Sequence, residues 1–154
     1  MKTSFATIVL SLAGAAFAAP AAGSGPYPYS VDSLTVKHTT EDKTWHMVLG
    51  LTYRDDSAQA IESTTCYASW VDGADPSGPT SPKACADPAF TFWFPNGVGN
   101  LDNYDVLANG PEGTAGGNIA SGPKYQCGPY EGHLDNVDKE CKITNGGQFY
   151  LKKQ

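Results

Sequence analysis

The stretch that decides the fold is residues 45–54, which read WHMVLGLTYR. Large apolar side chains occupy every second position from Trp45 to Tyr53, and His, Val, Gly and Thr lie between them. Successive side chains of a strand point to opposite faces of a sheet, so this alternation predicts a long strand with one buried face. Such a strand needs partners, and the flanking sequence supplies candidates on both sides.

Several shorter segments also have the pattern of strands. Residues 31–36 precede the long strand across a polar turn at 39–43, and residues 61–71 follow it. Phe90, Phe92 and Phe94 form the clearest aromatic alternation, bounded by prolines. Weaker strands are expected at 104–108, 118–120, 141–144 and 148–152, whereas residues 109–122 have the composition of a loop.

Apolar residues do not recur at helical spacing over three turns anywhere in the chain. Strands of modest length separated by turns are typical of all-β proteins. The sequence therefore predicts an all-β fold, a single compact antiparallel β-barrel or sandwich with two disulfides.

The N-terminus has the layout of a secretory signal peptide. Lys2 is followed by an apolar run from Phe5 to Phe17, which is shorter than a membrane span, and Ala16-Phe17-Ala18 supplies a small-x-small cleavage site. We expect residues 1–18 to be removed, residues 19–29 to form a flexible leader rich in Pro and Gly, and residues 30–154 to fold as the β-barrel domain. The predicted location is secreted and extracellular.

Four cysteines remain after this processing, Cys66, Cys85, Cys127 and Cys141. An even number in an exported chain predicts disulfides, and three pairings can be drawn. Pairing Cys66 with Cys85 and Cys127 with Cys141 is favoured, because each pair brackets a loop rich in Gly, Pro or polar residues. A zinc site is disfavoured because no Cys-x-x-Cys pair occurs.

Charge narrows the range of partners. Without the signal peptide the chain carries nine basic and 16 acidic residues. The closest approach to a basic patch is Lys152-Lys153 at the C-terminus, so nucleic acids and anionic membranes are not expected as partners. No later segment is long and apolar enough to span a membrane, and no dinucleotide or EF-hand motif predicts a cofactor or a metal ion.

No motif points to catalysis. His38, His46 and His133 are expected on the surface, and a Gly-x-Ser-x-Gly nucleophile motif is absent. We therefore expect a protein that is not an enzyme. The alternative is a small secreted hydrolase of cell-wall material that uses Asp102 or Asp105, and an antimicrobial toxin is less favoured because such proteins are commonly basic.

The chain resembles the Alternaria major allergen family of small secreted fungal β-barrel proteins. The likeness spans roughly residues 29–153 and rests on cysteine order, chain length and four segments. These segments are ADPAFTFWFPNG (86–97), PKYQC (123–127), KECKIT (139–144) and FYLKK (149–153).

The resemblance implies a fungal effector or elicitor that engages host plant proteins, for example thaumatin-like defence proteins, or binds small flavonoids, and that acts as an allergen. It also implies the disulfides Cys66–Cys85 and Cys127–Cys141. The family's additional N-terminal cysteine, which links two subunits, is missing here, so a covalent dimer is not expected. Trp70 and Trp93 are the candidate binding residues, because aromatic side chains that point away from a core concentrate binding energy at interfaces.

Overall fold

The computed structural model describes residues 27–55, 57, 59–74, 82–144 and 146–154. The predicted signal peptide and most of the predicted leader lie outside these residues. Within them the chain forms ten strands and no helix. The strands are β1 (Tyr29–Thr39), β2 (Thr44–Arg54), β3 (Ala60–Val71), β4 (Lys83–Ala84), β5 (Thr91–Trp93), β6 (Asn103–Gly110), β7 (Gly113–Ala120), β8 (Tyr125–Pro129), β9 (Val137–Ile143) and β10 (Phe149–Lys153).

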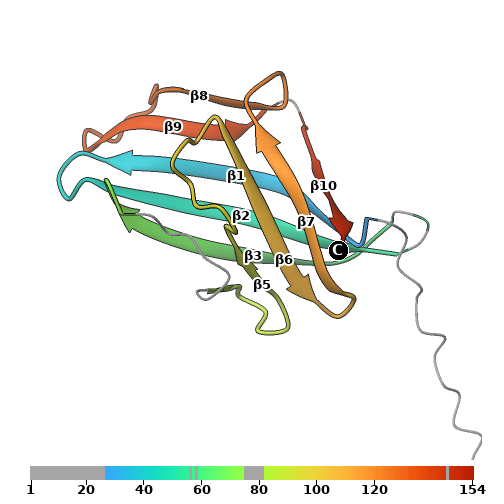
Figure 1. The fold of residues 1–154 in the computed structure, drawn as a ribbon. Helices are drawn as coiled ribbons and strands as arrows, with labels where there is room; N and C mark the ends of the chain where they lie inside the picture. The colour runs from blue at the N-terminus through green and yellow to red at the C-terminus, as the bar shows by residue number, and fades with distance from the viewer. Residues whose placement is uncertain (1–26, 56, 58, 75–81, 145) are drawn as a thin grey trace, which may run out of the picture.

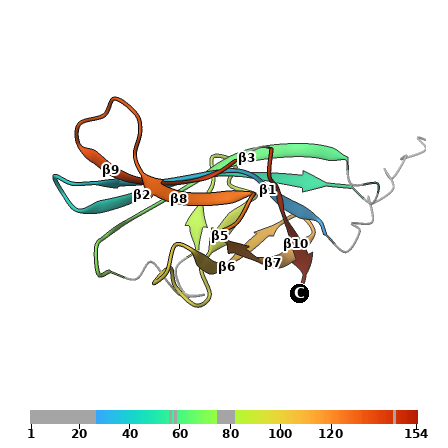
Figure 2. The ribbon, with the colours of Figure 1, turned by 90° about the horizontal axis from the view of Figure 1, so that it is seen from above.

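The strands form one strongly bent antiparallel sheet. Hydrogen-bonded neighbours follow the order β3-β2-β1-β10-β7-β6-β5-β4, and β9 and β8 branch from β1. Figure 1 shows β9, β1, β2 and β3 side by side, with β6 and β7 crossing them at an angle. Seen from above, the two groups lie in separate layers (Figure 2). The inward side chains of both layers form the core between them.

Strand β1 belongs to both layers because one of its edges pairs with two different strands. Along one edge it pairs with β2 over almost its whole length. On the other edge Tyr29–Val31 pairs with β10, and Thr35–Thr39 pairs with β9. The register shifts between Val31 and Ser33, as a β-bulge does, and a bulge bends a strand. The bend lets one strand lead from one layer into the other.

A disulfide lies where the two ends of the strand order meet. Cys85, directly after β4, forms an antiparallel bridge and a disulfide with Cys66 of β3. The next residue continues the contact, since the Ala86 N–H donates to the Thr65 carbonyl over 2.7 Å. The sheet is therefore nearly closed into a barrel, and the predicted all-β fold with two disulfides is confirmed. The second predicted disulfide, Cys127–Cys141, joins directly opposed residues of β8 and β9.

Aromatic rings fill the core. As expected, Phe90, Phe92 and Phe94 point inward, and each is at most 1% exposed. Ring contacts at edge-to-face angles continue from Phe94 to Tyr104 and from Tyr104 to Tyr125, with centroids 5.9 and 6.2 Å apart. Burial raises the pKa of the Tyr125 phenol to about 12. The aromatic alternation in the sequence thus marks the centre of the molecule.

The structure corrects two expectations about segment boundaries. Tyr29, expected in the leader, is the first residue of β1 and is fully buried. Residues 109–122, expected to be a loop, lie largely in β6 and β7. Glycine is needed there for close packing: a Cβ atom at Gly116 would meet Leu107 at 2.3 Å, and one at Gly117 would meet the Tyr150 carbonyl oxygen at 3.1 Å. The many glycines of residues 109–122 therefore reflect close packing between strands and not a loop.

The two disulfides should differ in their contribution to stability. Each closes a loop of similar length, with sequence separations of 19 and 14, and such a loop is worth about 3 kcal/mol in the chain-entropy model. Cys66 is fully buried, whereas Cys127 is exposed. We expect Cys66→Ala/Cys85→Ala to lower the unfolding free energy more than Cys127→Ala/Cys141→Ala. Urea denaturation of both double variants measures the difference. Equal losses of unfolding free energy would contradict a special role for Cys66–Cys85, which joins the two ends of the strand order.

The Tyr29 hydroxyl should contribute to stability because it joins the layers. It donates to the Gly113 carbonyl and accepts from the Glu112 N–H, both over 3.0 Å. Tyr29→Phe leaves these groups without that partner, which should cost about 1–3 kcal/mol in urea denaturation. Tyr150→Phe is the matched control, since Tyr150 is 46% exposed, and it should change stability by less than about 0.5 kcal/mol. Equal effects of the two variants would show that Tyr29 does not act through its hydroxyl.

Candidate functional site

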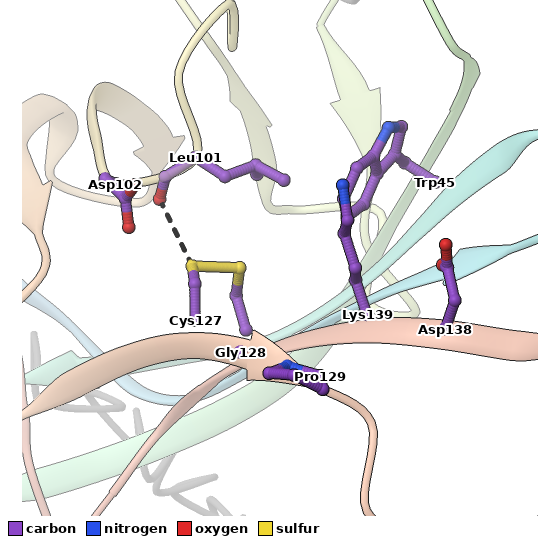
Figure 3. Close-up of a pocket in the computed structure, with 9 residues that line it drawn as sticks. Trp45, Leu101, Asp102, Cys127, Gly128, Pro129, Asp138 and Lys139 are labelled. Carbon is purple, nitrogen blue, oxygen red and sulfur yellow. Dashed lines mark hydrogen bonds between the residues drawn. A yellow bond between two sulfur atoms is a disulfide. The ribbon is translucent and has the colours of Figure 1, made fainter.

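One cavity lies beside Trp45, at the end of the molecule where β2 begins. We call it the Trp45 pocket; its volume is about 440 Å³, within the usual size of ligand sites. Figure 3 shows Leu101 reaching toward Trp45 from the opposite wall, and the Cys127–Cys141 disulfide forming the floor. The pocket is lined by Trp45, Leu101, Asp102, Cys127, Gly128, Pro129, Asp138, Lys139 and Cys141.

The Trp45 indole is held in a fixed orientation. Trp45 belongs to the inward face of β2, as the alternation predicts, but at the open end of the barrel it is only half-buried. Its ring packs on the His38 ring with centroids 4.6 Å apart, and its Nε1 donates to the Asp72 carboxylate over 2.5 Å. The remaining surface of the indole is available to the pocket.

His38 corrects an expectation, because it is 8% exposed and not on the surface. Its Nδ1 is hydrogen-bonded to Asp138 Oδ1 over 2.6 Å, and its Nε2 lies 3.2 Å from Asp72 Oδ2. The hydrogen bond with His38 holds the pKa of the Asp138 carboxyl below its usual value. The Asp138 hydrogen bond therefore fixes the imidazole, which in turn supports Trp45, whereas Nε2 makes no hydrogen bond to the residues that the structure describes. His46 and His133 are exposed, as expected.

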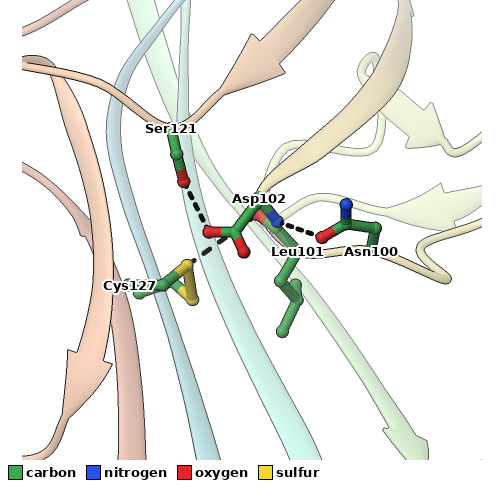
Figure 4. Close-up of a disulfide and its surroundings, with 6 residues drawn as sticks. Asn100, Leu101, Asp102, Ser121 and Cys127 are labelled. Carbon is green, nitrogen blue, oxygen red and sulfur yellow. Dashed lines mark hydrogen bonds between the residues drawn. A yellow bond between two sulfur atoms is a disulfide. The ribbon is translucent and has the colours of Figure 1, made fainter.

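Asp102 and Lys139 bring opposite charges to the rim of the pocket. Asp102 Oδ1 accepts a hydrogen bond from Ser121 Oγ over 2.6 Å (Figure 4). The Cys127 sulfur lies 3.8 Å from the Leu101 carbonyl oxygen, so the disulfide packs directly under the Leu101–Asp102 turn. Lys139 extends from β9 and lines the same pocket as Trp45 (Figure 3). The site thus combines an apolar floor and wall with a cation and a carboxylate.

A second hollow, of about 340 Å³, shares Trp45 and Leu101 with the pocket. Trp70 lines it, directly opposite Trp45 in the β2–β3 register. We expected Trp70 to point away from the core, but it is 8% exposed and its ring packs against Phe94. Trp70 is therefore part of the core and also lines the hollow.

Trp93, the other candidate binding residue, lies on β5 and faces away from the inward Phe92 and Phe94. Its exposure is intermediate, and within the described part of the chain its buried Nε1 has no hydrogen-bond partner. The structure does not bring Trp93 to the Trp45 pocket. The pairing of Trp45 with Trp70 was missed because an alternating strand pattern does not show which inward residue lies at an open end.

The two carboxylates considered for hydrolysis do not form a pair. Asp102 lines the Trp45 pocket, whereas Asp105 lies in another surface hollow and accepts hydrogen bonds from the Asn96 and Asn118 amides. A glycosidase needs two carboxyl groups across one substrate bond, one of them with a raised pKa. Asp138, the other carboxylate of the pocket, has a lowered pKa. The geometry offers no acid and base of that kind at these positions.

A different surface carries the exposed apolar side chains of β2 and β3. Val48 and Tyr67 are directly paired across these strands and are 42% and 57% exposed. Val71, 53% exposed, follows on the same side of β3. We call these three residues the Tyr67 face. These residues alternate with the buried side chains of β2 and β3, so the Tyr67 face lies on the outer side of this layer, away from the core.

The described residues contain no group of three or more His, Cys, Asp or Glu side chains that could hold a metal ion. In the same part of the chain, no helix has the length and apolar character to cross a bilayer. Comparison with known proteins finds no matching family model, curated protein or solved structure. The resemblance to the Alternaria allergen family therefore stays a prediction.

Acid should weaken the contact that supports Trp45. A carboxyl with a lowered pKa in the folded chain stabilises the fold above its ordinary value of 3.8, and this contribution disappears as the pH falls through the folded-state pKa. Hydrogen bonds from Thr39 and Ser57 lower the pKa values of Asp42 and Asp55, so these two carboxyls act in the same direction. We expect Tm to fall on acidification from pH 5 to about pH 2.5, and less steeply in Asp138→Asn.

Asp135→Asn is the matched control for this measurement, because it removes a carboxylate just before β9 without removing the partner of His38. Its Tm, followed by circular dichroism, should keep the wild-type dependence on pH. If Asp138→Asn and Asp135→Asn give the same profile, the His38–Asp138 contact does not contribute to the acid sensitivity.

Proposed function

We propose that this chain is an exported, non-catalytic binding protein of the effector or elicitor type, which engages an extracellular host protein. Two disulfides support an oxidising compartment. The fungal origin, the plant host and the allergenic role belong to the proposal through the sequence resemblance alone. The nearly closed barrel offers a stiff scaffold on which a binding surface costs little conformational entropy.

The single observation that carries the proposal is the Tyr67 face. Exposed large apolar side chains are normal when scattered, but a tyrosine paired directly with a valine on the outer side of the sheet makes a local apolar centre. Tyrosine is among the residues that most often dominate binding energy, because it buries a large ring with few rotatable bonds. Tyr67 therefore replaces Trp70 as the preferred binding residue of β3.

Charged residues border this centre. Thr35 of β1 is the neighbour of Val48, and Lys37 lies beside the exposed His46. Glu140 of β9 accepts from Lys142 over 2.6 Å and lies 3.6 Å from Lys37. An apolar centre with a polar rim is the usual anatomy of a transient protein interface. The paired charges also favour a partner that offers both signs over a strongly charged surface.

The test measures binding of the mature chain to a purified plant thaumatin-like protein by surface plasmon resonance. We expect saturable binding, and we expect Tyr67→Ala to weaken it at least about tenfold, as truncation of a dominant interface residue does. Circular dichroism should be unchanged, because the Tyr67 ring is exposed and not part of the core.

Leu134→Ala serves as the control, since Leu134 is 50% exposed but lies on the β8–β9 connection. It should bind like the wild type. Equal affinities of Tyr67→Ala and wild type would show that another surface is used. A wild-type chain that does not bind would refute this class of partner.

A further inference from the structure

We propose that the Trp45 pocket is a carbohydrate site that binds a neutral, β-1,4-linked pyranose chain. This site is separate from the Tyr67 face, since Trp45 points to the inner side of β2 and Val48 to the outer side. The two activities can therefore be tested independently.

The first argument is the shape of the apolar surface. A pyranose ring in the chair form presents a flat face of C–H groups, which packs on an aromatic ring. Trp45 offers such a ring, and the His38 ring behind it and the Asp72 carboxylate at its Nε1 hold it in place before any ligand arrives. A fixed platform binds with less loss of entropy than a mobile one. Leu101 and the Cys127–Cys141 disulfide complete the apolar walls.

The second argument is the polar rim. Each sugar hydroxyl can both donate and accept, so adjacent hydroxyls fit a site that offers a donor beside an acceptor. Lys139 supplies the donor in the lining of the pocket. Asp102 supplies the acceptor: Ser121 occupies its Oδ1, while Oδ2 accepts no hydrogen bond from the residues that the structure describes. Hydrogen bonds to charged groups are stronger than those between neutral groups, which offsets the loss of sugar hydration.

The third argument is charge, which excludes acidic sugars. The carboxylates of Asp102 and Asp138 line the pocket and that of Asp72 accepts the indole N–H, whereas Lys139 is the one lysine or arginine among the lining residues. The whole chain is also acidic, with a net charge of −6. The carboxylate of a uronate would be repelled by these carboxylates at close range, so a neutral glycan is favoured over pectin-like polymers.

The fourth argument is the length of the site. The second hollow adjoins the pocket, since Trp45 and Leu101 line both, and Trp70 also lines the second hollow. Two hollows around one platform accommodate more than one sugar ring. Equatorial β-1,4 linkages give an extended, flat ribbon whose successive rings can follow such a path, whereas α-1,4 linkages curl the chain. The geometry therefore favours an oligosaccharide over a monosaccharide.

The test titrates the mature protein with cellohexaose and chitohexaose, with maltohexaose, hexagalacturonate and catechin as comparison probes. Indole N–H signals in ¹H–¹⁵N NMR spectra provide the readout, and the Trp45 signal is assigned by its loss in Trp45→Phe. We expect at least one β-1,4-linked probe to shift the Trp45 signal saturably and to leave that of Trp93 unchanged. The comparison probes should bind at least about tenfold more weakly.

Variants locate the site. Trp45→Ala should weaken binding about tenfold or more, and Trp93→Ala should leave it unchanged. Because Trp45 packs on His38, Asp102→Asn and Lys139→Met provide variants at the rim that spare the platform; each should weaken binding with no change in Tm. The proposal is overturned if neither β-1,4-linked probe binds, if hexagalacturonate or catechin binds more tightly, or if the rim variants bind like the wild type.

Discussion

The divided edge of β1 is the constraint on which the rest of the structure depends. The first residues of this strand must pair with β10 and the last with β9, while the opposite edge stays paired with β2. A straight strand could not serve partners in two layers, so the bulge at Val31–Ser33 is part of the architecture. The buried phenol of Tyr29 then fastens the start of β1 to the β6–β7 turn through Gly113 and Glu112.

The division of β1 also makes the Trp45 pocket. Because β9 follows the C-terminal half of β1, it carries Asp138 to His38 and Lys139 to the lining of the pocket. Strand β8 lies beyond β9 and brings the Cys127–Cys141 disulfide under the Leu101 turn. The disulfide that closes a loop in the sequence therefore forms the floor of a cavity in the fold. Stability and the shape of the site come from the same bond.

The two proposed sites divide the two sides of one strand. Outward residues of β2, with Val48 at the centre, join Tyr67 in an exposed apolar surface, and the inward Trp45 lines the cavity. Neither site requires a moving part, since the platform of Trp45 is held by His38 and Asp72 and the outer face is ordinary sheet surface. This arrangement fits a protein that binds, because preorganised surfaces lose little entropy on association.

Local sequence determined what depends on neighbouring residues: the alternation from Trp45 to Tyr53, the inward phenylalanines and the cysteine pairs that close short loops. The first two features follow from the two-residue period of a strand, and the cysteine pairs follow from the composition of the loops that they bracket. Only the tertiary structure decided that His38 is buried, that residues 109–122 are largely strand, and that Trp45 rather than Trp93 borders a cavity. These outcomes depend on partners elsewhere in the chain. Asp138 contacts His38, and the side chains of Leu107 and Leu151 pack closely against the glycines of β7. A pattern within one segment contains no information about which distant segment will lie against it.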